Sequence, residues 1–180
     1  MNIGLFLIYL IKINLMHINF LGVIIATLIP MVLGFVWYNP KVFGTAWMAA
    51  SGMTPEKAKA SNMAVVFGVS FVLAFFLAFA MQFVAIHQFH VTSLFFKQPI
   101  EDPTSEMGAL YKTIMDLLGS SYRTFKHGAL HGTIAGFMIA TPVLGTNAMF
   151  EGKGFKYIAI NCGYWIVCFG LMGGVVSAFA

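Results

Sequence analysis

Residues 20–37 read FLGVIIATLIPMVLGFVW, a continuous apolar run without a charged side chain. An α-helix rises about 1.5 Å per residue, so a run of this length comes close to crossing the roughly 30 Å hydrocarbon core of a membrane. Pro30 lies inside the run, which a membrane helix tolerates because neighbouring groups satisfy the backbone carbonyl that proline leaves free. We therefore predict a membrane-spanning helix over residues 18–37.

The composition of the whole chain extends this interpretation. Of its 180 residues, 59% are hydrophobic and 9% are charged, against about 25% charged in an ordinary soluble domain. The other apolar runs are continuous, whereas a β-barrel would show short segments of strict alternation. We predict an all-α fold, an integral membrane four-helix bundle that forms a single transmembrane domain over residues 1–180. The predicted spans are about 18–37, 63–86, 128–149 and 157–179.

The front end of the chain, residues 1–16, reads MNIGLFLIYLIKINLM and is interrupted by Lys12. Joined to the first span, it would make a helix far too long for one crossing. Two interpretations stay open. This N-terminal segment is either an amphipathic helix at the membrane interface or an extension upstream of a start at Met16.

The stretch 88–126 is too long for a simple connecting loop. We predict an extramembrane loop with an amphipathic helix at about 103–118, which Asp102-Pro103 opens and Gly119 closes. This helix is expected to lie on the membrane surface or to cap the bundle, and a partly ordered loop is the alternative. Its apolar stripe at helical spacing comprises Met107, Leu110, Tyr111, Ile114, Met115 and Leu118.

Positive charge is scattered along the chain, which has a net charge of +4. It lacks the concentrated basic stripe that nucleic acid binding needs, so anionic lipid headgroups are the expected partner and nucleic acid is not. Lysines close to the span ends weigh most in setting orientation. They favour the cytoplasmic side of the membrane for both short loops. These lysines are Lys41, Lys57, Lys59, Lys153 and Lys156.

An aromatic motif follows the first span directly. Tryptophan and tyrosine rings favour the headgroup level, with their polar atoms toward water, and a residue before proline leaves the helical region. We expect the helix to end at Asn39-Pro40 and a short interfacial helix to follow. The motif is interpreted as an aromatic belt and a turn, with a docking ledge or lid as the functional alternative. Its residues are Trp37, Tyr38, Asn39, Pro40, Phe43 and Trp47.

Two stretches of the chain carry a resemblance. The first is Gly34-x2-Trp37-Tyr38-Asn39-Pro40-x2-Phe43-Gly44-x2-Trp47-Met48, and the second is Met149-Phe150-Glu151-Gly152-Lys153-Gly154-Phe155-Lys156 followed by Ile160-Asn161-Cys162-Gly163-Tyr164-Trp165. Together they resemble a family of small bacterial membrane proteins catalogued as domain of unknown function 1761. The similar parts cover about 16–52 and 125–174. The resemblance implies a four-helix inner-membrane protein, and it implies no reaction because the family has no established activity.

All five histidines fall on one side of the membrane in the predicted topology. His17 begins the first span, His87 and His90 end the second, and His127 and His131 begin the third. Imidazole is the commonest metal ligand and titrates near neutral pH. We interpret His87, His90, His127 and His131 as a candidate site for a Zn or Cu ion or for a proton relay. Interfacial polar packing is the alternative.

Glycines mark two helix faces at which backbones could approach closely. We expect the third and fourth spans to pack together within the chain, with pairing between copies as the alternative. Asn161, close to Tyr164, is the expected interhelical hydrogen-bonding residue. The glycines are Gly128, Gly132 and Gly136 in the third span and Gly163, Gly170 and Gly174 in the fourth.

The predicted spans contain no charged residue near mid-membrane, which counts against an ion-coupled transporter. The sequence also offers neither a phosphate loop nor paired carboxylates at a span end, so an enzyme is not indicated. The leading hypothesis is a non-enzymatic membrane protein acting through helix association, as a homo-oligomer or an accessory subunit of a larger membrane complex. The alternative is a small transporter or a metal- or proton-handling protein that uses the histidines, and a membrane enzyme on a lipid or quinone-like substrate is a residual hypothesis.

Overall fold

The computed structural model describes residues 18–180, and that range is helical without a strand. The predicted N-terminal segment and His17 lie outside the described residues. Within the range, four helices are long and apolar enough to cross a membrane. This confirms the all-α class with four candidate spans. They are α2 (Phe20–Trp37), α5 (Met63–Ala85), the composite helix Phe125–Phe150 and α10 (Phe155–Ala178).

The composite helix has three parts: α8 (Phe125–Ala135), the π-helical turn η2 (Gly136–Ala140) and α9 (Thr141–Phe150). Pro142 is at the start of α9. In a regular α-helix its ring would meet the carbonyl four residues earlier. The wider π turn comes just before this point, and the Thr141 hydroxyl donates to the Gly136 carbonyl at 3.0 Å. The span therefore remains continuous past the proline.

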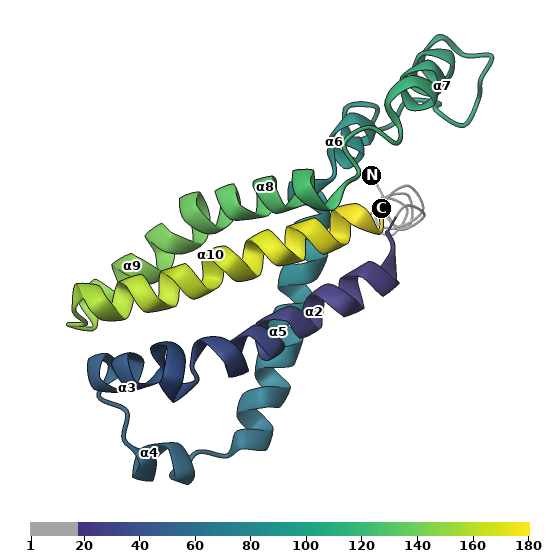
Figure 1. The fold of residues 1–180 in the computed structure, drawn as a ribbon. Helices are drawn as coiled ribbons and strands as arrows, with labels where there is room; N and C mark the ends of the chain where they lie inside the picture. Colours follow the sequence, from purple (N-terminus) through teal and green to yellow (C-terminus); the bar gives the residue numbers. More distant parts are fainter. Residues whose placement is uncertain (1–17) are drawn as a thin grey trace.

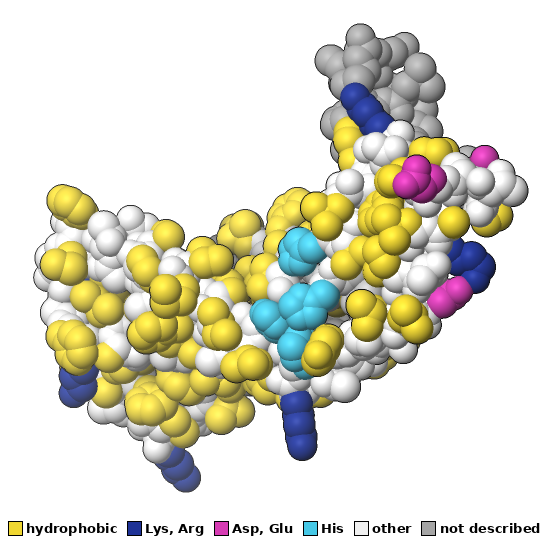
Figure 2. Space-filling view, turned by 90° about the horizontal axis from the view of Figure 1, so that it is seen from above, with side chains coloured by type: hydrophobic (Ala, Val, Ile, Leu, Met, Phe, Trp, Pro, Cys, Tyr) yellow, Lys and Arg dark blue, Asp and Glu magenta, His cyan; other side chains and the backbone are white. Residues whose placement is uncertain are grey.

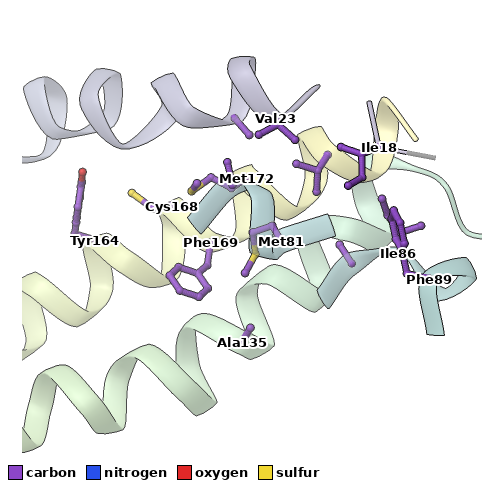
Figure 3. Close-up of a cluster of buried hydrophobic side chains, with 14 residues drawn as sticks. Ile18, Val23, Met81, Ile86, Phe89, Ala135, Tyr164, Cys168, Phe169 and Met172 are labelled. Carbon is purple, nitrogen blue, oxygen red and sulfur yellow. The ribbon is translucent and has the colours of Figure 1, made fainter. Parts of the chain in front are cut away.

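Helix α10 is the centre of the molecule. It lies between α8 and α2, and α5 crosses these helices obliquely (Figure 1). Half of the most apolar window of α10 is buried, against 28% for α2 and less for the other two spans. Cys168 and Met172 of α10 pack with Val23 of α2 and Met81 of α5 in the buried cluster (Figure 3). Close van der Waals packing of these side chains holds the helices around α10, because lipid tails leave no hydrophobic force between helices.

The connecting helices lie at the two ends of the molecule. At one end are α3 (Thr45–Ser51), α4 (Pro55–Ala60) and the turn between α9 and α10, and at the other are α6 (His87–Leu94) and α7 (Glu106–Leu118) (Figure 1). The Lys153 ammonium donates to the Ser51 carbonyl at 2.9 Å. This hydrogen bond joins the two short loops, as expected if both lie on one side of the membrane.

The helix in the long loop differs from its prediction at its start. Ser105, whose hydroxyl accepts from the Gly108 N–H at 3.0 Å, caps α7, which begins at Glu106. Asp102 does not open the helix, because its carboxylate accepts from the Thr104 N–H in a preceding turn. Within the apolar stripe, Tyr111 reaches α6: its ring lies 5.2 Å from that of Phe95 just beyond the end of α6, and its hydroxyl is 3.0 Å from Thr92 Oγ1. Leu110 and Leu118 of the stripe are exposed.

The aromatic motif also differs from its prediction. The Trp37 indole N–H donates to the Ile160 carbonyl at 3.1 Å, and the Tyr38 hydroxyl donates to Asn161 Oδ1 at 3.0 Å. The expectation that these polar atoms point to water is therefore wrong, because α10 lies close enough to accept both hydrogen bonds. Helix α2 does end at Trp37, and a π-helical turn, η1 (Pro40–Gly44), leads into the predicted short helix, α3. Phe43 packs on Trp37 and Trp47 packs on Tyr38.

Candidate metal site

The site rests on backbone contact between α8 and α10. A Cβ atom added to Gly132 would lie 2.1 Å from the Phe169 carbonyl oxygen, and one added to Gly128 would lie 2.2 Å from that of Gly173. Gly136 faces the backbone of Ile166 in the same way. The glycine stripe of the third span is thus packed against α10 of the same chain.

The glycines of α10 divide between two neighbours. Gly170 faces Thr133 and Gly174 faces the Phe125 ring, both on α8, whereas Gly163 faces the Trp37 ring of α2. Gly173, which the sequence reasoning did not select, makes a closer backbone approach than any of these, at 2.4 Å from its would-be Cβ to the Gly128 carbonyl oxygen. The adjacent glycines at 173 and 174 are the sequence feature from which Gly173 could have been predicted.

Three of the predicted histidines form a cluster, which we call the histidine triad: His87, His127 and His131. Ile86 is in an extended conformation, so α5 ends there and His87 begins α6. His127 and His131 lie one turn apart on α8. The Nε2 atom of His127 is 2.8 Å from that of His87 and 3.0 Å from that of His131. Residues 40 positions apart in sequence thus point their ring nitrogens at one place.

The triad lies partly buried at the end of α8, and Tyr122 packs against it. The Tyr122 ring stacks on that of His127, with centroids 4.8 Å apart, and meets that of His87 edge to face. The backbone of Tyr122 has φ of 64°, an unusual value for a residue other than glycine. Such conformations concentrate at functional sites. Figure 2 shows the histidine side chains gathered on one face among hydrophobic ones.

The remaining predicted residues lie elsewhere. His90 is exposed and does not belong to the triad. Asn161 does make an interhelical hydrogen bond, because its Oδ1 accepts from the Tyr38 hydroxyl at the end of α2. The Tyr164 hydroxyl makes a second one, since it donates to the Pro30 carbonyl of α2 at 2.5 Å.

The geometry of the triad suits a metal ion. Nitrogen ligands on a tetrahedral Zn²⁺ lie ~3.3 Å apart when each Zn–N bond is about 2.0–2.1 Å. The two short separations in the triad, 2.8 and 3.0 Å, reach this value with a small outward movement of the rings. All three ligand atoms lie within 4.8 Å of one another. Three imidazoles leave a coordination position open for water or another ligand.

Electrostatics favour the form of His87 that binds metal. Burial lowers the pKa of His87 below its ordinary value of 6.5, and the charges of His127 and His90 lower this pKa further. A metal ligand must be neutral imidazole. The surroundings therefore keep His87 ready for coordination at neutral pH.

The same effect predicts a pH dependence of the metal-free protein. The folded state binds a proton at His87 less readily than the unfolded state does, so protonation favours unfolding. We expect the melting temperature in detergent to fall as the pH drops below about 6.5. The His87→Gln variant should show a flatter profile between pH 7.5 and 5.5. Identical profiles for the two proteins would contradict this prediction.

The fold and the triad define a multi-pass helical membrane protein with a histidine cluster at the end of one span. The chain belongs to the family described as protein of unknown function DUF1761, whose model matches residues 21–177. This confirms the resemblance seen in the aromatic and glycine-containing stretches. No curated protein and no solved structure matches the chain.

Proposed function

We propose that this chain is a metal-binding membrane protein that holds a Zn²⁺ or Cu²⁺ ion at the histidine triad. The convergence of three Nε2 atoms from α6 and α8 is the observation that carries this proposal. Imidazole suits both of these metals. If imidazoles packed this closely were protonated, their positive charges would repel one another. In their neutral form, all three can stabilise one bound cation.

The glycine stripes do not by themselves support an association function. The stripe Gly128, Gly132 and Gly136 contacts α10 of the same chain, and the α10 glycines contact α8 and α2. Other exposed apolar surfaces remain for pairing with other copies or subunits, among them the first half of α5, where residues 63–73 are exposed, and the composite helix, where Phe137 and Met138 are exposed. Lipid covers such a surface equally well.

We further infer that the triad faces the outside of a bacterial inner membrane. The short loops carry Lys41, Lys57 and Lys59 on one connection and Lys153 and Lys156 on the other. Lysines near span ends favour the cytoplasmic side. The triad lies at the end opposite to these loops, so it would meet metal ions outside the cell.

Metal stoichiometry tests the proposal. The full chain in detergent is stripped of metal, loaded with Zn²⁺ or Cu²⁺ and desalted, and its metal is measured by mass spectrometry. We expect about one ion per chain, as for a three-histidine site. The double variant His127→Ala, His131→Ala should retain at least about tenfold less metal per chain than the wild type.

The matched control is His90→Ala, which removes an exposed imidazole on α6 outside the triad. This variant should keep its ion. A wild-type chain that stays empty after loading, or a double variant that binds as much as wild type while eluting at the same volume, would refute the metal site. If the wild-type chain held no metal, proton transfer along hydrogen-bonded imidazoles would better explain why the three histidines lie so close together.

A further inference from the structure

A second pocket lies at the other end of the molecule, between α9 and α10 beside the turn 151–154. It has a volume of about 280 Å³. Its wall combines one carboxylate, two amides and two aromatic rings. These are Glu151, Asn147, Asn161, Tyr157 and Trp165. A wall with this mixture of groups differs from the purely apolar surface that acyl chains prefer.

The carboxylate of Glu151 has no ion-pair or hydrogen-bond partner among residues 18–180. The neighbouring Lys153 is engaged elsewhere, because its ammonium donates to the Ser51 carbonyl and lies 5.5 Å from the centre of the Tyr157 ring. One negative charge at the pocket is therefore available to a ligand.

The other groups add acceptors and π faces. The Asn161 amide is fixed, since its Nδ2 donates to the Tyr157 carbonyl while its Oδ1 accepts from Tyr38 and keeps a second lone pair. The Asn147 side chain has no hydrogen-bond partner within the described range. The face of the Trp165 ring can attract a cation. Tyr157 already holds one ammonium, that of Lys153.

We propose that this pocket binds a phospholipid headgroup that carries a primary ammonium, as an ethanolamine headgroup does. The ammonium would donate to Glu151 and Asn147, which both line the pocket. A primary ammonium has three N–H donors for these acceptors. A quaternary ammonium has none and depends on a fuller aromatic cage.

The position of the pocket favours a lipid over a soluble amine. It lies where two candidate membrane spans, Phe125–Phe150 and Phe155–Ala178, reach their common turn. Lipid headgroups occupy this level of a bilayer. The proposal goes beyond metal binding and does not depend on it, since the triad lies at the opposite end.

Lipid binding to the delipidated full chain in detergent tests the proposal. Dioleoyl lipids with ethanolamine, choline or glycerol headgroups are titrated separately, and bound lipid is counted by native mass spectrometry. We expect the ethanolamine lipid to be retained about fivefold more than either of the others. Glu151→Gln and Asn147→Ala, both at exposed positions, should reduce this preference, the former to near equality.

The matched control is Glu106→Gln, which removes an exposed carboxylate at the α7 end. It should leave the preference unchanged. Equal retention of the three lipids, or an undiminished preference in Glu151→Gln, would overturn the proposal. Free phosphoethanolamine that competes as well as the lipid would overturn the lipid as the source. Zinc content is measured on the same preparations, so that a loss of lipid binding at this pocket can be distinguished from a loss of metal binding at the histidine triad.

Discussion

Gly132→Ala is expected to destabilise the protein by about 3 kcal/mol or more, near the top of the range for overpacked positions. The added Cβ would lie 2.1 Å from the carbonyl oxygen and 2.7 Å from the carbonyl carbon of Phe169. These are backbone atoms, so no side-chain rotation relieves the clash. Helix α8 must move away from α10, and the histidines on α8 must move with it.

Unfolding of the detergent-solubilised protein measures this effect, and Gly68→Ala is its control. Gly68 also lies inside a candidate span, α5, but a Cβ there meets no atom within 4 Å. Alanine at position 68 should be neutral or stabilising by up to about 1 kcal/mol, because glycine is the poorer helix former. Equal effects at positions 68 and 132 would show that the α8–α10 contact is not as close as described.

Gln82→Met is expected to stabilise the protein by about 1–2 kcal/mol. The Gln82 side chain is fully buried in the core on α5, and neither its Nε2 nor its Oε1 has a hydrogen-bond partner among residues 18–180. Burying an unpaired amide costs free energy that an apolar side chain of similar shape does not incur. Methionine fits because it is unbranched and flexible.

Gln88→Met is the matched comparison in the same unfolding measurement. Gln88 is also buried, but its Nε2 donates to the carbonyls of Leu118 at 2.8 Å and Ser121 at 3.0 Å. Its loss should destabilise the protein by roughly 1–3 kcal/mol, because two carbonyls lose their donor. If Gln82→Met proved destabilising as well, Gln82 would have a partner in the protein as purified, such as a bound molecule.

The sequence predicted the spans well because each is decided locally. The first span was expected at 18–37 and α2 runs from Phe20 to Trp37; the fourth was expected at 157–179 and α10 runs from Phe155 to Ala178. Length and continuous hydrophobicity suffice for such assignments. The close approach of the third and fourth spans followed from the glycine spacing, which is also a local pattern.

Features that depend on which helix lies opposite were not predictable in this way. Nothing near Trp37 in the sequence indicates that the Ile160 carbonyl would accept from it. His90 was grouped with His87 because the two share a helix, but the break at Ile86 turns α6 so that only His87 meets α8. Gly173 is not among the predicted glycines Gly163, Gly170 and Gly174, although its backbone approaches α8 most closely of the four.

The central position of α10 bears on how the protein is made. The elements that pack against it, among them α2, α5 and α8, all precede it in the chain. During synthesis these helices enter the bilayer before the segment that joins them has left the ribosome. Until then their glycine faces and buried amides are solvated by lipid tails and by whatever escorts insertion. The cell therefore has to protect an incomplete bundle, in which α5 can pack against α2 and α8 but the faces of α2 and α8 that meet α10 lack their partner, until α10 has been translated.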